Sequence, residues 1–194
     1  MVQIFKNFLT EEECGILTQI AMNGIQEKWI RPGISRGNFN YKKRLTSRMH
    51  MCGKKYPPYV IDISNKIKKF MNIDHYPIID GHGSDGVVVS VTYPGGDVYE
   101  HQDPRSINGL TTFRCNVMTQ ATEKGAKLYV EDELIDIEVG DLHCYYASEQ
   151  KHYVTEVGGN TPRVLWMFGA HRPLKDYYKM RSLYLNSQKV DNGT

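Results

Sequence analysis

The sequence has no long hydrophobic run, no marked excess of charge of one sign and few cysteines. Its longest strongly apolar stretch, residues 87–91, includes Ser90 and is far shorter than the roughly 20 residues that span a bilayer. The first residues lack the basic start and the apolar stretch of a signal peptide. We therefore expect a protein that has no membrane contact and resides in the cytoplasm.

The four cysteines are far apart, and no pair has the spacing of a metal-binding knuckle. The chain has 194 residues, of which 40% are hydrophobic, and a core of that size needs no disulfide framework. We interpret the cysteines as reduced thiols. Length and composition predict a single domain over residues 1–187, with a helical part to about residue 85, a β core over about 86–170 and a disordered tail over 188–194.

The small net charge of +2 is unevenly distributed along the chain. Residues 1–61 contain 10 lysines and arginines against 4 acidic residues, a balance of +6, and the remainder contains 14 against 18, a balance of −4. No acidic residue lies between Lys28 and Lys55, where aromatic residues stand among the basic ones. This stretch is interpreted as a surface that follows a phosphate backbone, or as a loop that carries charge for solubility or holds an acidic substrate.

Two helices are predicted in the first part of the chain. A capping box of Thr10 and Glu13 precedes a helix over residues 11–23. A pair of prolines begins a second helix over about residues 57–72, which has one apolar face. Residues 30–50 lack a clean period and are interpreted as a long loop, a candidate lid.

The second part of the chain has the period-two pattern of short strands. Turn residues separate eight such segments, which lie near residues 86–93, 98–103, 111–119, 127–130, 134–138, 142–147, 151–157 and 163–169. Helices followed by this many short strands predict a mainly β fold, a jelly roll or double-stranded β-helix, with the N-terminal helices packed on one side.

The motif His101-Gln102-Asp103 lies in one of the predicted strands. Because alternate residues of a strand share a face, this imidazole and this carboxylate can bind one ion. Two histidines and one carboxylate on one face of an octahedron leave three positions open, as in the non-haem Fe(II) oxygenases. The second histidine must come from another strand, for which His152 is the first candidate and His143 an alternative.

Arg163 opens the last predicted strand, after a glycine-rich turn at residues 158–160. A strand pair joined by this turn would place Arg163 beside His152 and deeper in the barrel. An arginine buried among apolar residues needs an anion, and its guanidinium fits a carboxylate. The alternatives are a hydrogen-bonded core histidine and an arginine paired with a structural aspartate, but the combined pattern favours a site.

These residues together resemble the 2-oxoglutarate- and Fe(II)-dependent oxygenases, and within them the prolyl-4-hydroxylase-like branch. The similarity includes Tyr93 to Asp103, the sequence Gly140-Asp141-Leu142, the segment from His152 to Arg163, and the helix entry at residues 5–14. It extends from about residue 3 to residue 169.

The resemblance implies that His101, Asp103 and His152 bind Fe(II). It also implies that Arg163 binds the C5 carboxylate of 2-oxoglutarate and that the hydroxyl of Tyr93 contacts this cosubstrate. Enzymes of this kind decarboxylate 2-oxoglutarate to succinate and hydroxylate a C–H bond with O2, and the resemblance further implies that ascorbate supports activity.

Two more residues are candidates for the substrate pocket. Tyr99 is expected on the same strand face as the two ligands of the motif, and Arg114 is expected to line the pocket or to form a structural salt bridge. We expect a prolyl or other amino-acid residue of a peptide or protein as the substrate. The alternatives are the same chemistry on a nucleic acid or a small metabolite, and a non-catalytic jelly-roll module that binds a metal or ligand.

Overall fold

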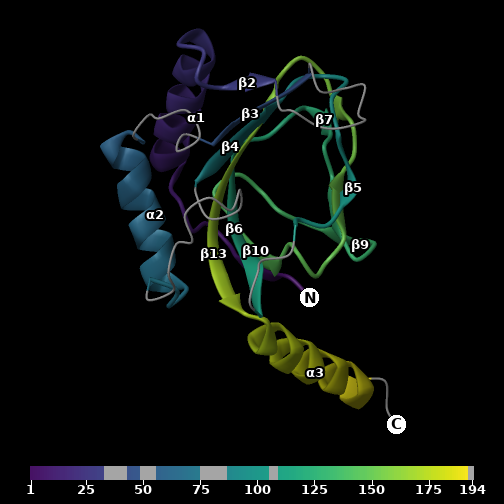
Figure 1. The fold of residues 1–194 in the computed structure, drawn as a ribbon. Coiled ribbons are helices and arrows are strands. Elements are labelled where there is room, and N and C mark those ends of the chain that lie inside the picture. Colours follow the sequence, from purple (N-terminus) through teal and green to yellow (C-terminus); the bar gives the residue numbers. More distant parts are fainter. Residues whose placement is uncertain (33–42, 49–55, 75–86, 105–108, 192–194) are drawn as a thin grey trace.

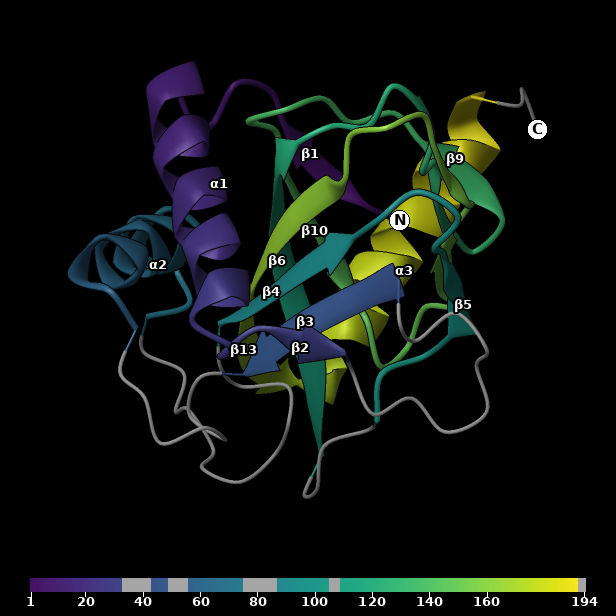
Figure 2. The ribbon, with the colours of Figure 1, turned by 90° about the horizontal axis from the view of Figure 1, so that it is seen from above.

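In the computed structural model, two antiparallel β-sheets face each other, and two helices cover the outer face of the larger sheet (Figure 1). The structure describes residues 1–32, 43–48, 56–74, 87–104 and 109–191. Seen from above, the helices, the larger sheet and the smaller sheet form successive layers (Figure 2). This is the mainly β jelly roll with helices on one side that the strand pattern predicted.

The larger sheet has seven strands, and the smaller sheet has four. In spatial order, the larger sheet consists of β1 (Gln3–Phe5), β10 (Leu142–Tyr146), β6 (Leu110–Gln120), β13 (Arg163–Pro173), β4 (Val88–Thr92), β3 (Arg44–Arg48) and β2 (Arg31–Pro32). The smaller sheet consists of β5 (Val98–His101), β11 (His152–Val154), β8 (Leu128–Val130) and β9 (Glu133–Ile135). A separate two-stranded ribbon pairs β12 (Val157–Gly158) with β7 (Lys124–Gly125).

The first two helices are α1 (Glu11–Gln26) and α2 (Pro58–Phe70). The predicted capping box of α1 is confirmed, because the Glu13 N–H donates to Thr10 Oγ1 at 3.2 Å and the Thr10 N–H donates to Glu13 Oε2 at 2.8 Å. Both helices bury one apolar face against the larger sheet, as their spacing of hydrophobic residues requires.

Two hydrophobic clusters fill the spaces between the three layers. The first lies between the helices and the larger sheet, and the second lies between the two sheets. Strand β6 shows the alternation that separates them: Phe113, Cys115 and Val117 belong to the first cluster, so Arg114 and Asn116 face the space between the sheets. The polar side chains of β6 therefore face the interior of the barrel.

The interpretation of residues 30–50 as one long loop was partly wrong. Strands β2 and β3 lie within that range and extend one edge of the larger sheet. The strands could not be predicted from the hydrophobic pattern, because the inward-facing residues of β3 are polar and do not alternate with apolar ones in the usual way. Residues 33–42 and 49–50 lie outside the described part of the chain.

The expected pairing of the strand that contains His152 with the strand that contains Arg163 was also wrong. Strand β11 pairs with β5 and β8 in the smaller sheet, whereas β13 pairs with β4 and β6 in the larger one. The turn at residues 158–160 carries the chain from one sheet to the other. His152 and Arg163 therefore belong to opposite walls of the barrel.

The segment after Pro173, which the sequence left unassigned, forms α3 (Leu174–Asp191), which lies beneath the barrel (Figure 1). Its Tyr177 is buried and packs against Tyr146 of β10. This helix includes residues 188–191 of the predicted tail, and residues 192–194 lie outside the described part. Within the described residues, every helix is too short or too polar to cross a membrane.

Candidate metal and cosubstrate site

Three potential metal ligands meet where β5 and β11 lie side by side. His101 ends β5, Asp103 follows it, and His152 begins β11. The two histidines are paired in register, with ring centroids 4.3 Å apart. The ligand atoms of all three residues lie within 4.8 Å of one another, and His101 Nε2 is 3.8 Å from Asp103 Oδ1. The structure thus brings together the three residues that the sequence predicted as metal ligands.

The backbone fixes the orientation of both imidazoles. Nδ1 of His101 donates to the Tyr99 carbonyl at 2.8 Å, and Nδ1 of His152 donates to the Gln150 carbonyl at 3.0 Å. Each ring therefore keeps Nε2 as the free lone pair. Burial, with a smaller effect of the neighbouring His101, lowers the pKa of His152 to about 4, so this ring is neutral at physiological pH and can bind a metal.

Arg114 holds one oxygen of the candidate carboxylate ligand. Its Nε and Nη2 lie 2.9 and 2.8 Å from Asp103 Oδ2, while Oδ1 faces His101. Burial alone would raise the pKa of Asp103, but the charge and the hydrogen bonds of Arg114 lower it below its ordinary value. The carboxylate is therefore ionised, with Oδ1 left for a metal. The salt bridge expected as an alternative for Arg114 is present, and its partner is the candidate ligand itself.

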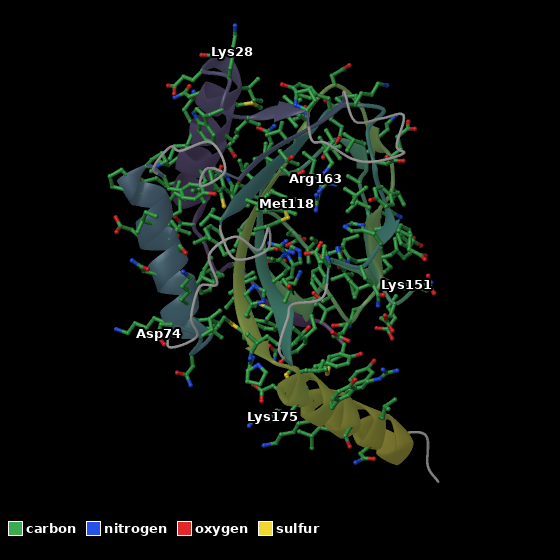
Figure 3. All side chains as sticks on the ribbon, viewed as in Figure 1. Lys28, Asp74, Met118, Lys151, Arg163 and Lys175 are labelled. Atoms are coloured by element: carbon green, nitrogen blue, oxygen red, sulfur yellow. The ribbon has the colours of Figure 1, made fainter. Side chains whose placement is uncertain are left out.

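Arg163 lies across the barrel from the three ligands, and its side chain points into the space between the sheets (Figure 3). It is 2% exposed, and its Nε and Nη2 have no hydrogen-bond partner among the described residues. Arg44 lies on the other side of Thr92, because β13 and β3 both pair with that residue. Burial, with a smaller effect of Arg44, lowers the pKa of Arg163 to about 10, so both arginines remain charged.

Other buried polar atoms of the interior also lack partners within the described residues. They are the Thr92 hydroxyl, Asn116 Oδ1 and both ring nitrogens of His143. Tyr145, two residues after His143 on β10, places its ring 5.1 Å from that of His152. Buried polar atoms therefore face the interior on the same side of the larger sheet as Arg163.

The donor set fits a divalent metal with an anionic chelator. Two imidazoles and one carboxylate match a facial triad that leaves coordination positions open. A buried arginine without a counter-ion is costly unless an anion binds it. The arrangement can therefore hold a metal on one wall of the barrel and a carboxylate on the other.

The remaining predicted site residues lie in different surroundings. The ring of Tyr99 is 5.1 Å from that of His101 and 47% exposed, so it borders the site on its open side. Tyr93 packs against the cluster between the larger sheet and the helices, and its contact with the cosubstrate stays a prediction. His143, the alternative ligand, lies outside the group formed by the three metal ligands.

Sequence reasoning missed three residues that face this interior: Arg44, Asn116 and Tyr145. The alternation within β10 would have revealed Tyr145, because it shares a strand face with His143. Arg44 was counted only as part of the basic stretch, yet its Nε donates to Ser90 Oγ at 3.0 Å within the larger sheet.

No family model and no curated protein matches this chain in sequence. Solved structures, however, match its fold over most of their length. A prolyl-4-hydroxylase from Pseudomonas putida superposes with a TM-score of 0.63 at 13% identity, covering 89% of this chain and 92% of that one. The viral collagen prolyl hydroxylase from Paramecium bursaria Chlorella virus-1, a 2-oxoglutarate complex, gives 0.60 at 16% identity and covers 89% and 95%.

A third match is a prolyl hydroxylase from Trichoplax adhaerens in complex with a peptide fragment of the hypoxia-inducible factor oxygen degradation domain. Its TM-score is 0.60 at 15% identity, with 86% of this chain and 83% of that one covered. The three proteins come from a bacterium, a virus and an animal, and they share the arrangement of sheets described above. The chain therefore has the jelly-roll fold of these prolyl hydroxylases.

Proposed function

We propose that this protein is a dioxygenase that uses Fe(II), 2-oxoglutarate and O2 to hydroxylate an unactivated C–H bond. The observation that supports this most strongly is the pairing of two features across one interior. His101, Asp103 and His152 bring three ligand atoms together, and Nε and Nη2 of the buried Arg163 have no hydrogen-bond partner among the described residues. A metal chelated by a dicarboxylate would satisfy both.

In this proposal His101 Nε2, Asp103 Oδ1 and His152 Nε2 hold the iron, and Arg163 binds the C5 carboxylate of 2-oxoglutarate. When bound, the iron and cosubstrate supply the oxidation, in which 2-oxoglutarate loses CO2 to become succinate. The protein orients the chelate between the two sheets. Because Arg163 is buried, its charge attracts a carboxylate more strongly than it would in water. Tyr99 lies where a substrate would approach the ligands.

We further propose a prolyl or other amino-acid residue of a peptide or protein as the substrate. Three proteins of this fold are named as prolyl hydroxylases, and one of them holds a peptide. A nucleic acid is less favoured, because Arg44 is directed towards Ser90 instead of forming an outer basic surface. Ascorbate is expected to support activity by keeping the iron reduced.

The experiment that tests this function is anaerobic absorption spectroscopy. Purified protein is loaded with Fe(II) and titrated with 2-oxoglutarate, and we expect the weak visible charge-transfer band of the chelate. The band should disappear in His101→Ala, because a ligand is lost, and should require at least tenfold more 2-oxoglutarate in Arg163→Ala, because a charged hydrogen-bond partner is lost.

The absence of a band in the wild-type protein, with iron either not bound or bound without 2-oxoglutarate, would contradict this function. It would favour a jelly-roll module that binds a different metal or ligand and consumes no 2-oxoglutarate. Circular dichroism of each variant verifies that the fold is retained.

A further inference from the structure

His143 is a buried histidine for which the proposed chemistry has no role. It stands in the middle of β10 and is 1% exposed. Neither Nδ1 nor Nε2 makes a hydrogen bond of ordinary geometry to the described residues, although the backbone carbonyl of Asp141 lies close enough to the ring to favour its protonated form. A buried polar side chain with no partner costs free energy, and this one has an N–H to donate as well as a lone pair.

The surroundings of His143 define what could satisfy it. Its ring is nearly parallel to that of Tyr145, at 6.4 Å, and it pairs in register with Asn116, whose Oδ1 also lacks a partner. Burial, followed in effect by the charge of Arg163, lowers the pKa of His143 to about 3. The ring is therefore neutral and lies within electrostatic range of the unpaired guanidinium.

His143 on β10 and Arg163 on β13 both face the interior from the larger sheet, with β6 between their strands, and each carries an N–H donor. Both donors need an acceptor, and the positive charge of Arg163 favours an anionic one. A carboxylate has two oxygens and room for several donors, so it can accept from Arg163 with one and from His143 with the other. A metal is not the natural partner here, because a nearby arginine would repel it.

We propose that His143 is a cosubstrate-binding residue whose ring N–H donates to the same carboxylate of 2-oxoglutarate that Arg163 binds. The inference rests on the proposed function and deepens it, since it assigns the end of the cosubstrate pocket to β10 as well as to β13. It predicts selectivity for a ligand with a carboxylate at C5.

The test compares two ligands that differ only at C5. 2-Oxoglutarate ends in a carboxylate, and 2-oxopentanoate ends in a methyl group. Isothermal titration calorimetry on Mn(II)-loaded protein gives their dissociation constants without turnover. We expect His143→Leu to weaken 2-oxoglutarate about tenfold, which is the size of one hydrogen bond to a charged group, and to change 2-oxopentanoate by less than about twofold. His143→Gln, which keeps an N–H donor, should recover most of the loss.

Equal weakening of both ligands in His143→Leu would overturn the proposal, because it would indicate a structural role. So would an unchanged affinity for 2-oxoglutarate. If the wild-type protein binds Mn(II) but not 2-oxoglutarate, the proposed function itself fails. This outcome differs from one in which the wild type binds and His143 has no effect.

A second measurement covers the case in which the leucine variant does not fold. In wild-type protein containing ¹⁵N-histidine and Zn(II), 2-oxoglutarate should shift the ring N–H resonance of His143, which is assigned by its absence from His143→Gln. 2-Oxopentanoate should leave that resonance in place. A resonance that does not respond to 2-oxoglutarate would overturn the proposal independently.

Discussion

Asp103 is the residue on which the proposed metal site depends most, because its two oxygens have different surroundings. Oδ2 accepts both donors of Arg114, and Oδ1 faces His101 Nε2 at 3.8 Å. The guanidinium therefore acts through the carboxylate, by fixing which oxygen points to the metal. Outer partners of this kind typically change metal affinity 10- to 100-fold when they are removed.

We expect Arg114→Met to weaken Mn(II) binding at least tenfold. The methionine leaves Oδ2 of Asp103 without its partner, so the carboxylate is free to rotate and Oδ1 is no longer aimed. Metal titrations followed by electron paramagnetic resonance, in the absence of 2-oxoglutarate, measure the change. Glu100→Ala is the matched control, because Glu100 lies next to His101 but pairs with Lys151 on the surface, and its Mn(II) affinity should stay unchanged. Equal affinities of Arg114→Met and the wild type would contradict a positioning role.

At the scale of the elements, the strand pattern predicted where the ligands would lie better than how the strands pair. His101 and Asp103 could be located because a strand alternates its faces, and His152 because it falls in another β-type segment. Pairing partners carry no local signal, so the separation of β11 and β13 into two sheets was missed. Strand β3, which lies between β4 and the edge strand β2, was missed because Arg44 and Thr46 are polar on its inner face.

The buried carboxylate of Asp141 connects the turn before β10 to the segment that follows β1. Asp141 accepts the backbone N–H of Asn7 at 2.9 Å and that of Glu138 at 2.8 Å, and Lys6 reaches it at 2.9 Å. The side chain of Asp141 is fully buried, whereas that of Lys6 is half exposed. The two hydrogen bonds that Asp141 accepts from the backbone should therefore contribute more to the free energy of unfolding than its ion pair with Lys6.

We expect Asp141→Ala to lower the free energy of unfolding by about 2 kcal/mol, because two backbone donors lose their acceptor. Lys6→Ala removes the exposed ion pair and a long hydrogen bond to the Asp136 carbonyl, and it should lower the free energy of unfolding by much less than Asp141→Ala does. Urea unfolding followed by circular dichroism measures both. A larger loss in Lys6→Ala than in Asp141→Ala would reverse this assignment.

At the scale of the whole molecule, the fold separates an apolar layer from a cationic interior. Helices α1 and α2 and the larger sheet share an extensive hydrophobic cluster, and this supports the opposite face of the sheet, where Arg44, Arg114 and Arg163 lie. One of these arginines, Arg114, pairs with the carboxylate of Asp103. The sequence could not have predicted this excess, since its basic residues appear in three distant segments and only the sheet pairing brings them together.

The same burial makes the stability of the metal-free protein depend on pH. In the folded state the pKa of His143 is lowered to about 3, from an ordinary value of 6.5. Between these values the unfolded chain binds a proton that the folded protein does not, so the free energy of unfolding falls as the pH falls through this window. One such group contributes a slope of about 1.4 kcal/mol per pH unit.

We therefore expect the wild-type protein, free of metal and cosubstrate, to lose stability steeply between pH 6 and pH 4.5, as measured by urea unfolding at a series of pH values. His143→Gln cannot take up this proton, so its slope over that range should be smaller by about 1.4 kcal/mol per pH unit. His152 titrates similarly in both proteins, since its pKa is lowered to about 4 in the fold, and it cancels in the comparison. Parallel curves for the two proteins would mean that His143 gains a proton in the folded state near its ordinary pKa, and thus that the pocket around it admits water.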